Sequence, residues 1–280
     1  MDYKILVDSC CDLPQEKRKE SQFEIVPLTM EVNGEFFVDD ETFDINEYIK
    51  KMKASPVAPK TACPSPEDYL KRIDGEEKNI FIVTLSSELS GSYNSAILAK
   101  NIYEEEHPGE KFIYVFNSRS AASAEVLIAL KIDELYKQGR KAEDIVKEVS
   151  DYISEQKTYF VLESLDNLKK SGRLSNIQAI LANVLNIKPI MGSTSEGTIR
   201  KIDQTRGIKK ALVRMAEIIG EERDKLSDKI CGISHCNCLE RALAFKDELL
   251  KRYNFKDIII VETAGISTTY ANDGGIVVAV

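Results

Sequence analysis

The chain has 280 residues, of which 43% are hydrophobic and 30% are charged, a balance typical of a folded globular protein rather than a disordered one. Its net charge of −8, with no lysine- or arginine-rich segment, argues against nucleic-acid binding, which requires positive charge to neutralise phosphates. The length allows two modest domains or one large one.

The N-terminal sequence MDYKILVDS leads directly into a strand-like segment, without the basic and apolar regions of a secretory signal. The longest apolar runs, FIVTL and IIIV, are far shorter than the roughly 20 residues of a spanning helix, so we expect no stable membrane insertion. The six cysteines are scattered and do not form the framework of a secreted disulfide-rich domain. We therefore expect a cytoplasmic protein with reduced thiols.

Through the first half of the chain, short β-rich runs alternate with amphipathic stretches, which is the pattern of a parallel α/β sheet. The pair Asn33-Gly34 between two apolar runs is typical of a type I′ β-hairpin. Gly139 is a natural end for the longest helical stretch. Strands are predicted at residues 4–9, 25–32, 35–40, 78–86 and 111–118, and helices at 15–20, 41–55, 93–106, 120–139 and 143–157.

From about Thr158 the pattern changes, because several strands follow one another with helices between only some of them. This favours an α+β domain with a mixed or antiparallel sheet after an N-terminal parallel-sheet α/β/α domain. The expected boundaries are 1–157 and 158–280, and since no Pro/Gly/Ser-rich linker joins the two parts, we expect them to pack closely around a cleft. The predicted strands of the second part are 159–164, 187–193, 197–203, 229–235, 256–264 and 274–280.

A serine-rich loop, TLSSELSGSYNSA at residues 84–96, connects a predicted strand to a predicted helix, where open α/β sheets bind ligands. The backbone N–H groups around Gly91, with the hydroxyls of Ser87, Ser90 and Ser92, would form a compact donor array for an anion. Ordinary helix capping is the alternative interpretation, but it requires one hydroxyl rather than several.

Two further segments are candidates on weaker grounds. In KTACPSPEDY, residues 60–69, prolines stiffen the loop that carries Thr61, although a lone threonine is more often structural. In SLDNLKKSGRLS, residues 164–175, Lys169, Lys170 and Arg173 form a basic cluster in an acidic protein. That cluster is either a cationic helix end or a docking point for phosphate or an acidic partner.

Motifs for other chemistries are incomplete. The sequence lacks GxGxxG, and the segment from Gly192 to Gly197 lacks the Gly-Lys-Ser/Thr continuation of a phosphate loop. Ser234 lies in half of a nucleophile elbow. Cys236-x-Cys238 has a poor spacing for zinc, so we expect no metal, no cofactor and no catalytic residue.

The ordered set of segments VDSCCDLP, PLTMEVNGEFFVDD, TACPSPEDY, SSELSGSYNSA, SLDNLKKSGRLS and NIKPIM resembles the DegV family of bacterial fatty-acid-binding proteins, from Asp8 to Val280. The resemblance implies two domains with a long-chain, palmitate-like fatty acid in a deep pocket between them. It also implies a role in lipid transport or fatty acid metabolism without turnover by the chain alone. Some relatives present the bound acyl chain to a separate fatty acid kinase, which makes such a kinase the implied partner.

Residue by residue, the resemblance implies that Thr61 and Ser90, with Gly91 and Ser92, hold the carboxylate. It implies that Arg206 lies near the head group and that Lys169, Lys170 and Arg173 face the partner. Many relatives carry a Gly-Thr-His-x-Gly-Pro-Gly motif near the C-terminus, but in this sequence Thr269 stands roughly where the histidine is found, and we expect Thr269 to be among the ligand-binding residues. The departure puts acyl phosphorylation in doubt and leaves fatty acid binding intact.

Residues 180–187 and 274–280 are apolar enough to line the tail pocket, but the sequence does not distinguish lining from core. Two alternatives to a fatty acid carrier remain open. One is a phosphotransfer or acyl-transfer enzyme that uses the serine loop as an anion hole. The other is a regulatory interaction protein whose cleft has no ligand.

Overall fold

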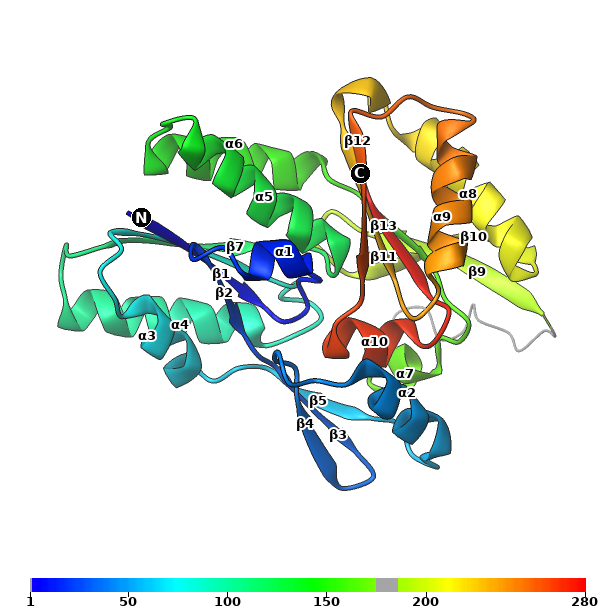
Figure 1. Cartoon of the computed structure of the whole chain (residues 1–280), viewed down its shortest axis with the longest axis horizontal. Helices are drawn as coiled ribbons and strands as arrows, with labels where there is room; N and C mark the ends of the chain where they lie inside the picture. Colours follow the sequence, from blue (N-terminus) through cyan, green and yellow to red (C-terminus); the bar gives the residue numbers. More distant parts are fainter. Residues whose placement is uncertain (1, 175–185) are drawn as a thin grey trace.

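The structure is a computed structural model that describes residues 2–174 and 186–280. Its first layer is a parallel sheet in the order β2-β1-β6-β7. The α3–α4 pair covers one face of this sheet and the α5–α6 pair covers the other (Figure 1). The strands are β1 (Tyr3–Asp8), β2 (Phe23–Val26), β6 (Asn79–Thr84) and β7 (Phe112–Asn117), and the helices are α1 (Gln15–Arg18), α3 (Pro66–Ile73), α4 (Ser92–Glu106), α5 (Ser123–Lys137) and α6 (Ala142–Glu155).

A second, mixed sheet has the order β10-β9-β8-β13-β11-β12, in which only β11 and β12 pair in parallel. Helices α8 and α9 cover its outer face, where the largest apolar cluster lies. The strands are β8 (Thr158–Val161), β9 (Ile187–Ser193), β10 (Ile199–Arg206), β11 (Ile230–His235), β12 (Asp257–Glu262) and β13 (Ile276–Ala279), and the helices are α8 (Ile208–Glu222), the 3₁₀ turn η2 (Leu226–Asp228) and α9 (Leu239–Leu250). The predicted fold class is therefore confirmed.

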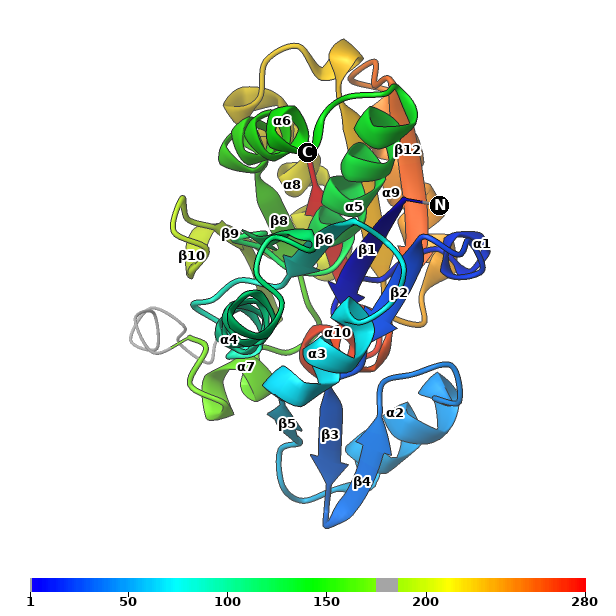
Figure 2. The same ribbon diagram turned by 90° about the vertical axis from the view of Figure 1, so that its left-hand side faces the viewer.

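A small antiparallel sheet, β4-β3-β5, projects from the two main sheets together with α2 (Figure 2). Its elements are β3 (Thr29–Val32), β4 (Glu35–Val38), β5 (Lys60–Ala62) and α2 (Ile45–Ala54). Positive φ angles at Asn33 and Gly34 form the predicted tight turn. The single strand expected at residues 25–32 is two strands instead, because Pro27 lacks the N–H that a continuous central strand would require.

Helix α5 lies between the two main sheets and packs on both. Gly232 permits this approach, since a Cβ atom there would lie 2.9 Å from the Cβ of Ser123. Two short helices, α7 (Asp166–Lys170) and α10 (Gly265–Ala271), contact each other, and α10 also packs on α2 and β3. The second sheet begins at Thr158. Helix α5, before this boundary, packs on strands after it, and α10, after the boundary, packs on α2 and β3 before it, so the division at 157/158 stays a prediction. Within the described residues, the helices are all too short or too polar to cross a bilayer.

Candidate ligand cavity

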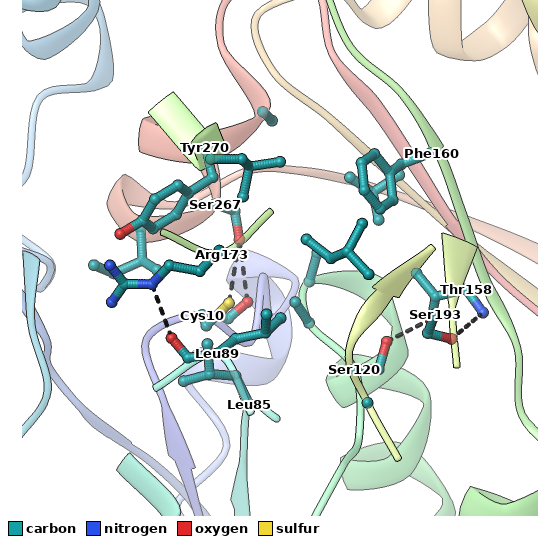
Figure 3. A pocket seen from close by; sticks show the side chains of 18 of the residues that line it. Cys10, Leu85, Leu89, Ser120, Thr158, Phe160, Arg173, Ser193, Ser267 and Tyr270 are labelled. Atoms are coloured by element: carbon teal, nitrogen blue, oxygen red, sulfur yellow. Dashed lines mark hydrogen bonds between the residues drawn. The ribbon is translucent and has the colours of Figure 1, made fainter. Parts of the chain in front are cut away.

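A cavity lies where the loops after β1, β6 and β7 face the second sheet and α10 (Figure 3). The carboxyl ends of parallel strands meet at this edge, which is where open α/β sheets bind ligands. The space between its atoms is about 780 Å³, open solvent at the mouth included. Most of the wall is apolar, and its carbon-rich side chains include Leu85, Leu89, Phe160, Leu162, Leu168, Ile199, Ile266 and Val277.

One end of the cavity carries a polar group built from Tyr270 and Arg173. The guanidinium carbon of Arg173 lies 5.7 Å from the centre of the Tyr270 ring, within the range of a cation–π contact. The hydroxyl of Tyr270 is 2.8 Å from the hydroxyl of Thr61 in β5. Thr61 is therefore not in the cavity wall, but it is hydrogen-bonded to Tyr270, which is part of that wall. We call Thr61, Arg173 and Tyr270 the polar end.

The end of helix α7 determines where Arg173 points. Gly172 adopts φ +82°, and its N–H donates to the carbonyl of Lys169 while the N–H of Arg173 donates to the carbonyl of Leu168. This pair of bonds is a Schellman motif, which reverses the chain direction. Arg173 consequently enters the cavity, and its Nε donates to the carbonyl of Leu89 at 3.1 Å. Lys169 and Lys170 stay exposed on the outside.

The serine loop lies against the polar end. Leu89 is part of the cavity wall, and Ser90 follows it with a partly buried side chain. The Ser90 hydroxyl oxygen accepts a hydrogen bond from the N–H of Ser92 at 3.2 Å. A Cβ atom at Gly91 would lie 3.0 Å from the sulfur of Cys63, so the glycine lets this loop approach the strand that carries Thr61. The structure therefore brings the two hydroxyl loops together.

Ser92 has a different environment from Ser90. Its hydroxyl is fully buried, donates to a carboxylate oxygen of Asp8 at 2.5 Å and is hydrogen-bonded to the hydroxyl of Tyr69 at 2.6 Å. Asp8 also accepts from the N–H groups of Cys10 and Leu85, both in the cavity wall. Burial raises the pKa of Asp8 to about 6, while its hydrogen bonds from Ser92 and Leu85 oppose the rise. Ser92 and Asp8 thus fix the loops rather than face the cavity.

Two buried carboxyl groups hold the start of α10. Asp39 accepts from the N–H groups of Gly265 and Ile266 at 2.6 and 2.8 Å, and Asp12 accepts from that of Ala264 at 2.8 Å. Burial raises the pKa of Asp39 to about 6 and that of Asp12 to about 7, against the opposing effect of these bonds. Because α10 carries Tyr270, these carboxyl groups position the polar end.

Thr269, the residue at the expected histidine position, does not face the cavity. Its buried hydroxyl donates to the carbonyl of Gly265 and is 2.7 Å from the hydroxyl of Tyr48. One helical step further, Tyr270 joins Ile266, Ser267 and Ala271 on the cavity side of α10. Sequence reasoning missed Tyr270, although the spacing 266, 267, 270, 271 of a helical face would have indicated it.

Arg206 is exposed and lies outside the cavity wall. It pairs with Ile187 at one end of the β9–β10 ladder, whereas Ser193 and Ile199 pair at the other end and line the cavity. Ile199 and Arg206 are the two ends of the eight-residue strand β10 and lie roughly 20 Å apart. The geometry gives no support to a head-group role for Arg206.

The predicted tail-lining segments are only partly described. Residues 180–185 lie outside the described residues, and Val277 of the C-terminal segment lines the cavity. His235, near the cysteines considered for zinc, is buried, and burial lowers its pKa. Across residues 2–174 and 186–280, no group of three or more His, Cys, Asp or Glu side chains is arranged to hold a metal ion.

The family model described as "Uncharacterised protein, DegV family" matches residues 2–280. A DegV domain-containing protein of Streptococcus gordonii is 37% identical over 278 residues, which cover 99% of this chain and 98% of that protein.

Two solved structures share the whole fold. A DegV family protein of Ruminococcus gnavus, refined with vaccenic acid, has a TM-score of 0.97 at 49% identity, covering 100% of this chain and 99% of that one. The Fatty Acid Kinase (Fak) B3 protein of Streptococcus pneumoniae, loaded with linoleic acid, has a TM-score of 0.91 at 35% identity, with coverage of 100% and 99%.

Proposed function

The chain belongs to the DegV family, and on that premise we propose that it binds a long-chain, palmitate-like fatty acid in the cavity. The carboxylate lies at the polar end, and the acyl tail runs along the apolar wall toward β8, β9 and β10. The observation that carries this proposal is the apolar cavity whose wall ends at Tyr270 and Arg173, with Thr61 hydrogen-bonded to Tyr270 behind it. The related structures that hold vaccenic and linoleic acid support the ligand class.

Donors for a carboxylate are available at the polar end. The Thr61–Tyr270 contact uses one hydroxyl proton and leaves the other for a ligand. Arg173 uses Nε and Nη1 on the carbonyls of Leu89 and Ser171, and no acceptor for its Nη2 group is found among residues 2–174 and 186–280. Ser90 accepts one hydrogen bond, and in the described part of the chain no residue accepts its own proton. A buried carboxylate requires such donors, because otherwise it would take up a proton.

Among the other site residues, we assign Gly91 to the close approach of the two hydroxyl loops and Ser92 and Thr269 to holding the loops and α10 in place. Arg173 supplies the positive charge that a histidine-free site needs at neutral pH. Tyr270, one residue after the position of the motif histidine, donates a hydrogen bond to the head group. A phenol hydroxyl donates one hydrogen bond.

The tail supplies most of the affinity. Each buried methylene contributes about 0.8 kcal/mol, so a chain of about fifteen contributes on the order of 12 kcal/mol before the costs of association. Those costs are several kcal/mol. Submicromolar binding therefore requires no covalent chemistry, and the chain acts as a carrier without turnover of its own.

We further propose that the loaded protein presents its acyl chain to a fatty acid kinase. The support is the likeness to the Fak B3 protein and the position of Lys169 and Lys170, which are exposed on the helix that leads to Arg173. A Lys169→Glu/Lys170→Glu variant should lose kinase-dependent acyl phosphate formation and keep its fatty acid affinity. Unchanged acyl phosphate formation would exclude this surface.

Mass spectrometry of lipid extracted from the purified protein tests the binding proposal. We expect one or more long-chain fatty acids in about stoichiometric amount, and at least a tenfold lower occupancy in a Thr61→Val/Ser90→Ala double variant. A matched surface variant, Thr42→Val/Ser154→Ala, alters two exposed hydroxyls elsewhere and should retain the lipid. A lipid-free wild-type protein that also fails to take up added fatty acid would refute the proposal.

A further inference from the structure

The end of the cavity away from Arg173 and Tyr270 is also polar. Ser120 precedes α5, Thr158 begins β8, and Ser193 ends β9 next to Thr198, and all four line the cavity. Figure 3 shows Ser120, Thr158 and Ser193 together on the side opposite Arg173. We call Ser120, Thr158 and Ser193 the distal hydroxyl cluster. An unsubstituted alkyl chain has no atom that can pair with such groups.

The hydrogen bonds of this cluster leave donors unused. The hydroxyls of Ser120 and Thr158 bond to each other, which uses one of their two protons. The hydroxyl oxygen of Ser193 accepts from the N–H of Thr158 at 3.3 Å. Within residues 2–174 and 186–280, no acceptor is found for the Ser193 proton or for the second proton of the Ser120–Thr158 pair.

Burial makes these unused donors significant. Ser120 and Thr158 are each only 6% exposed, so they have little access to solvent once the cavity is filled. A methyl-terminated chain would displace water from these hydroxyls without replacing its hydrogen bonds, which costs free energy. An oxygen atom on the distal part of the chain would accept their protons instead.

Building on the proposed function, we propose that the preferred ligands of this chain include fatty acids with a hydroxyl on the distal half of the acyl chain, and that the distal hydroxyl cluster binds that hydroxyl. A purely apolar wall would weaken the binding of an acyl chain that carries a hydroxyl. A wall with unpaired donors forms hydrogen bonds with that hydroxyl and so removes this loss of affinity. The Thr158 hydroxyl bonds to Ser120 and its backbone N–H donates to Ser193, so Thr158→Val removes the hydroxyl contact and keeps the backbone contact.

The test compares stearic acid with hydroxystearic acids that carry the hydroxyl at several positions from carbon 9 to carbon 18. Dissociation constants are measured for the full-length delipidated wild type, for Thr158→Val and for Ser120→Ala/Ser193→Ala. Valine keeps the shape of threonine and removes its hydroxyl, so the cavity volume is retained. Thermal denaturation of each variant without ligand checks that it is folded.

In the wild type, at least one distal hydroxystearic acid should bind within threefold of stearic acid or more tightly. In both variants the same acid should bind at least tenfold more weakly than stearic acid. The inference is overturned if every hydroxy acid binds the wild type at least tenfold more weakly than stearic acid, or if the ratio is the same in all three proteins. Failure of the proposed function looks different, because stearic acid itself would then not bind.

Discussion

The hydroxyl groups of Thr61 and Tyr270 lie 2.8 Å apart although 209 positions separate them in the sequence. The contact joins the small sheet that carries β5 to helix α10, beside the cavity. In the binding mode that we propose, a ligand carboxylate meets this contact, and Arg173 lies over the Tyr270 ring.

Removing either hydroxyl should weaken fatty acid binding. We expect Thr61→Val and Tyr270→Phe each to lower affinity by about 10- to 100-fold, because a hydrogen bond to a charged group contributes about 1.5–3 kcal/mol. The double variant should lose less than the sum, since the two hydroxyls share one hydrogen bond. Calorimetric titration gives the dissociation constant of the fatty acid for each of the three variants. Fully additive losses would show that the hydroxyls act independently.

Arg173 should discriminate between charged and neutral ligands. Arg173→Leu removes the positive charge and is expected to weaken binding of a fatty acid by at least about tenfold. The fatty alcohol of equal length should bind the variant and the wild type with affinities within about threefold of each other. Lys170→Leu alters an exposed neighbouring cation and serves as the control. Equal losses for acid and alcohol would assign Arg173 a structural role instead.

Val277 on β13 should limit how much acyl chain the cavity holds. A Val277→Phe substitution fills part of the cavity, and each excluded methylene removes about 0.8 kcal/mol, or roughly fourfold in affinity. Affinity for an 18-carbon acid should therefore fall about tenfold more than affinity for a 14-carbon acid. Val213→Phe changes an exposed valine on α8 and is the matched control. A uniform loss at all chain lengths would mean that Val277 does not border the tail.

Asp12 should make the stability of the ligand-free protein depend on pH. Its folded pKa of about 7 exceeds the ordinary value of 3.8, so the folded state binds this proton more tightly than the unfolded state. Its contribution to stability is fully present below pH 3.8 and is lost as the pH rises through 7. This shift of the pKa corresponds to a loss of roughly 4 kcal/mol in the free energy of unfolding over this pH range.

Asp12→Asn removes this titration and keeps an oxygen that accepts from the N–H of Ala264. Relative to the wild type, the variant should become progressively more stable as the pH increases from 5 to 8, as measured by urea denaturation. The control variant Asp151→Asn, on the exposed side of α6, should show the same change of stability with pH as the wild type. A constant difference between Asp12→Asn and the wild type across this range would contradict the assignment.

Much of the fold follows from local sequence patterns. Alternation of apolar runs and amphipathic stretches predicted the parallel sheet, and Asn33-Gly34 predicted a turn that requires two positive φ angles. The separate small sheet was not predicted, because it depends on how β3 meets β5 across 27 intervening residues. Pairing over such distances is decided by packing of the whole chain and not by local pattern.

The site was predicted less completely. The serine loop was recognisable because several serines and a glycine exceed what helix capping needs, whereas Thr61 was indicated by the family resemblance alone. Tyr270 was missed since the motif comparison placed Thr269 at the histidine position, and the helical phase of α10 decides which of the two faces the cavity. Arg173 was expected at the partner surface, but the left-handed turn at Gly172 directs it to the cavity wall.

The most direct measurement is a crystal structure of the protein as purified, with electron density examined in the cavity. The account predicts one continuous elongated density whose forked end lies within hydrogen-bonding distance of the Thr61 and Tyr270 hydroxyls and the Arg173 guanidinium. Density with its polar end elsewhere, or a cavity that holds only water after incubation with fatty acid, would contradict it.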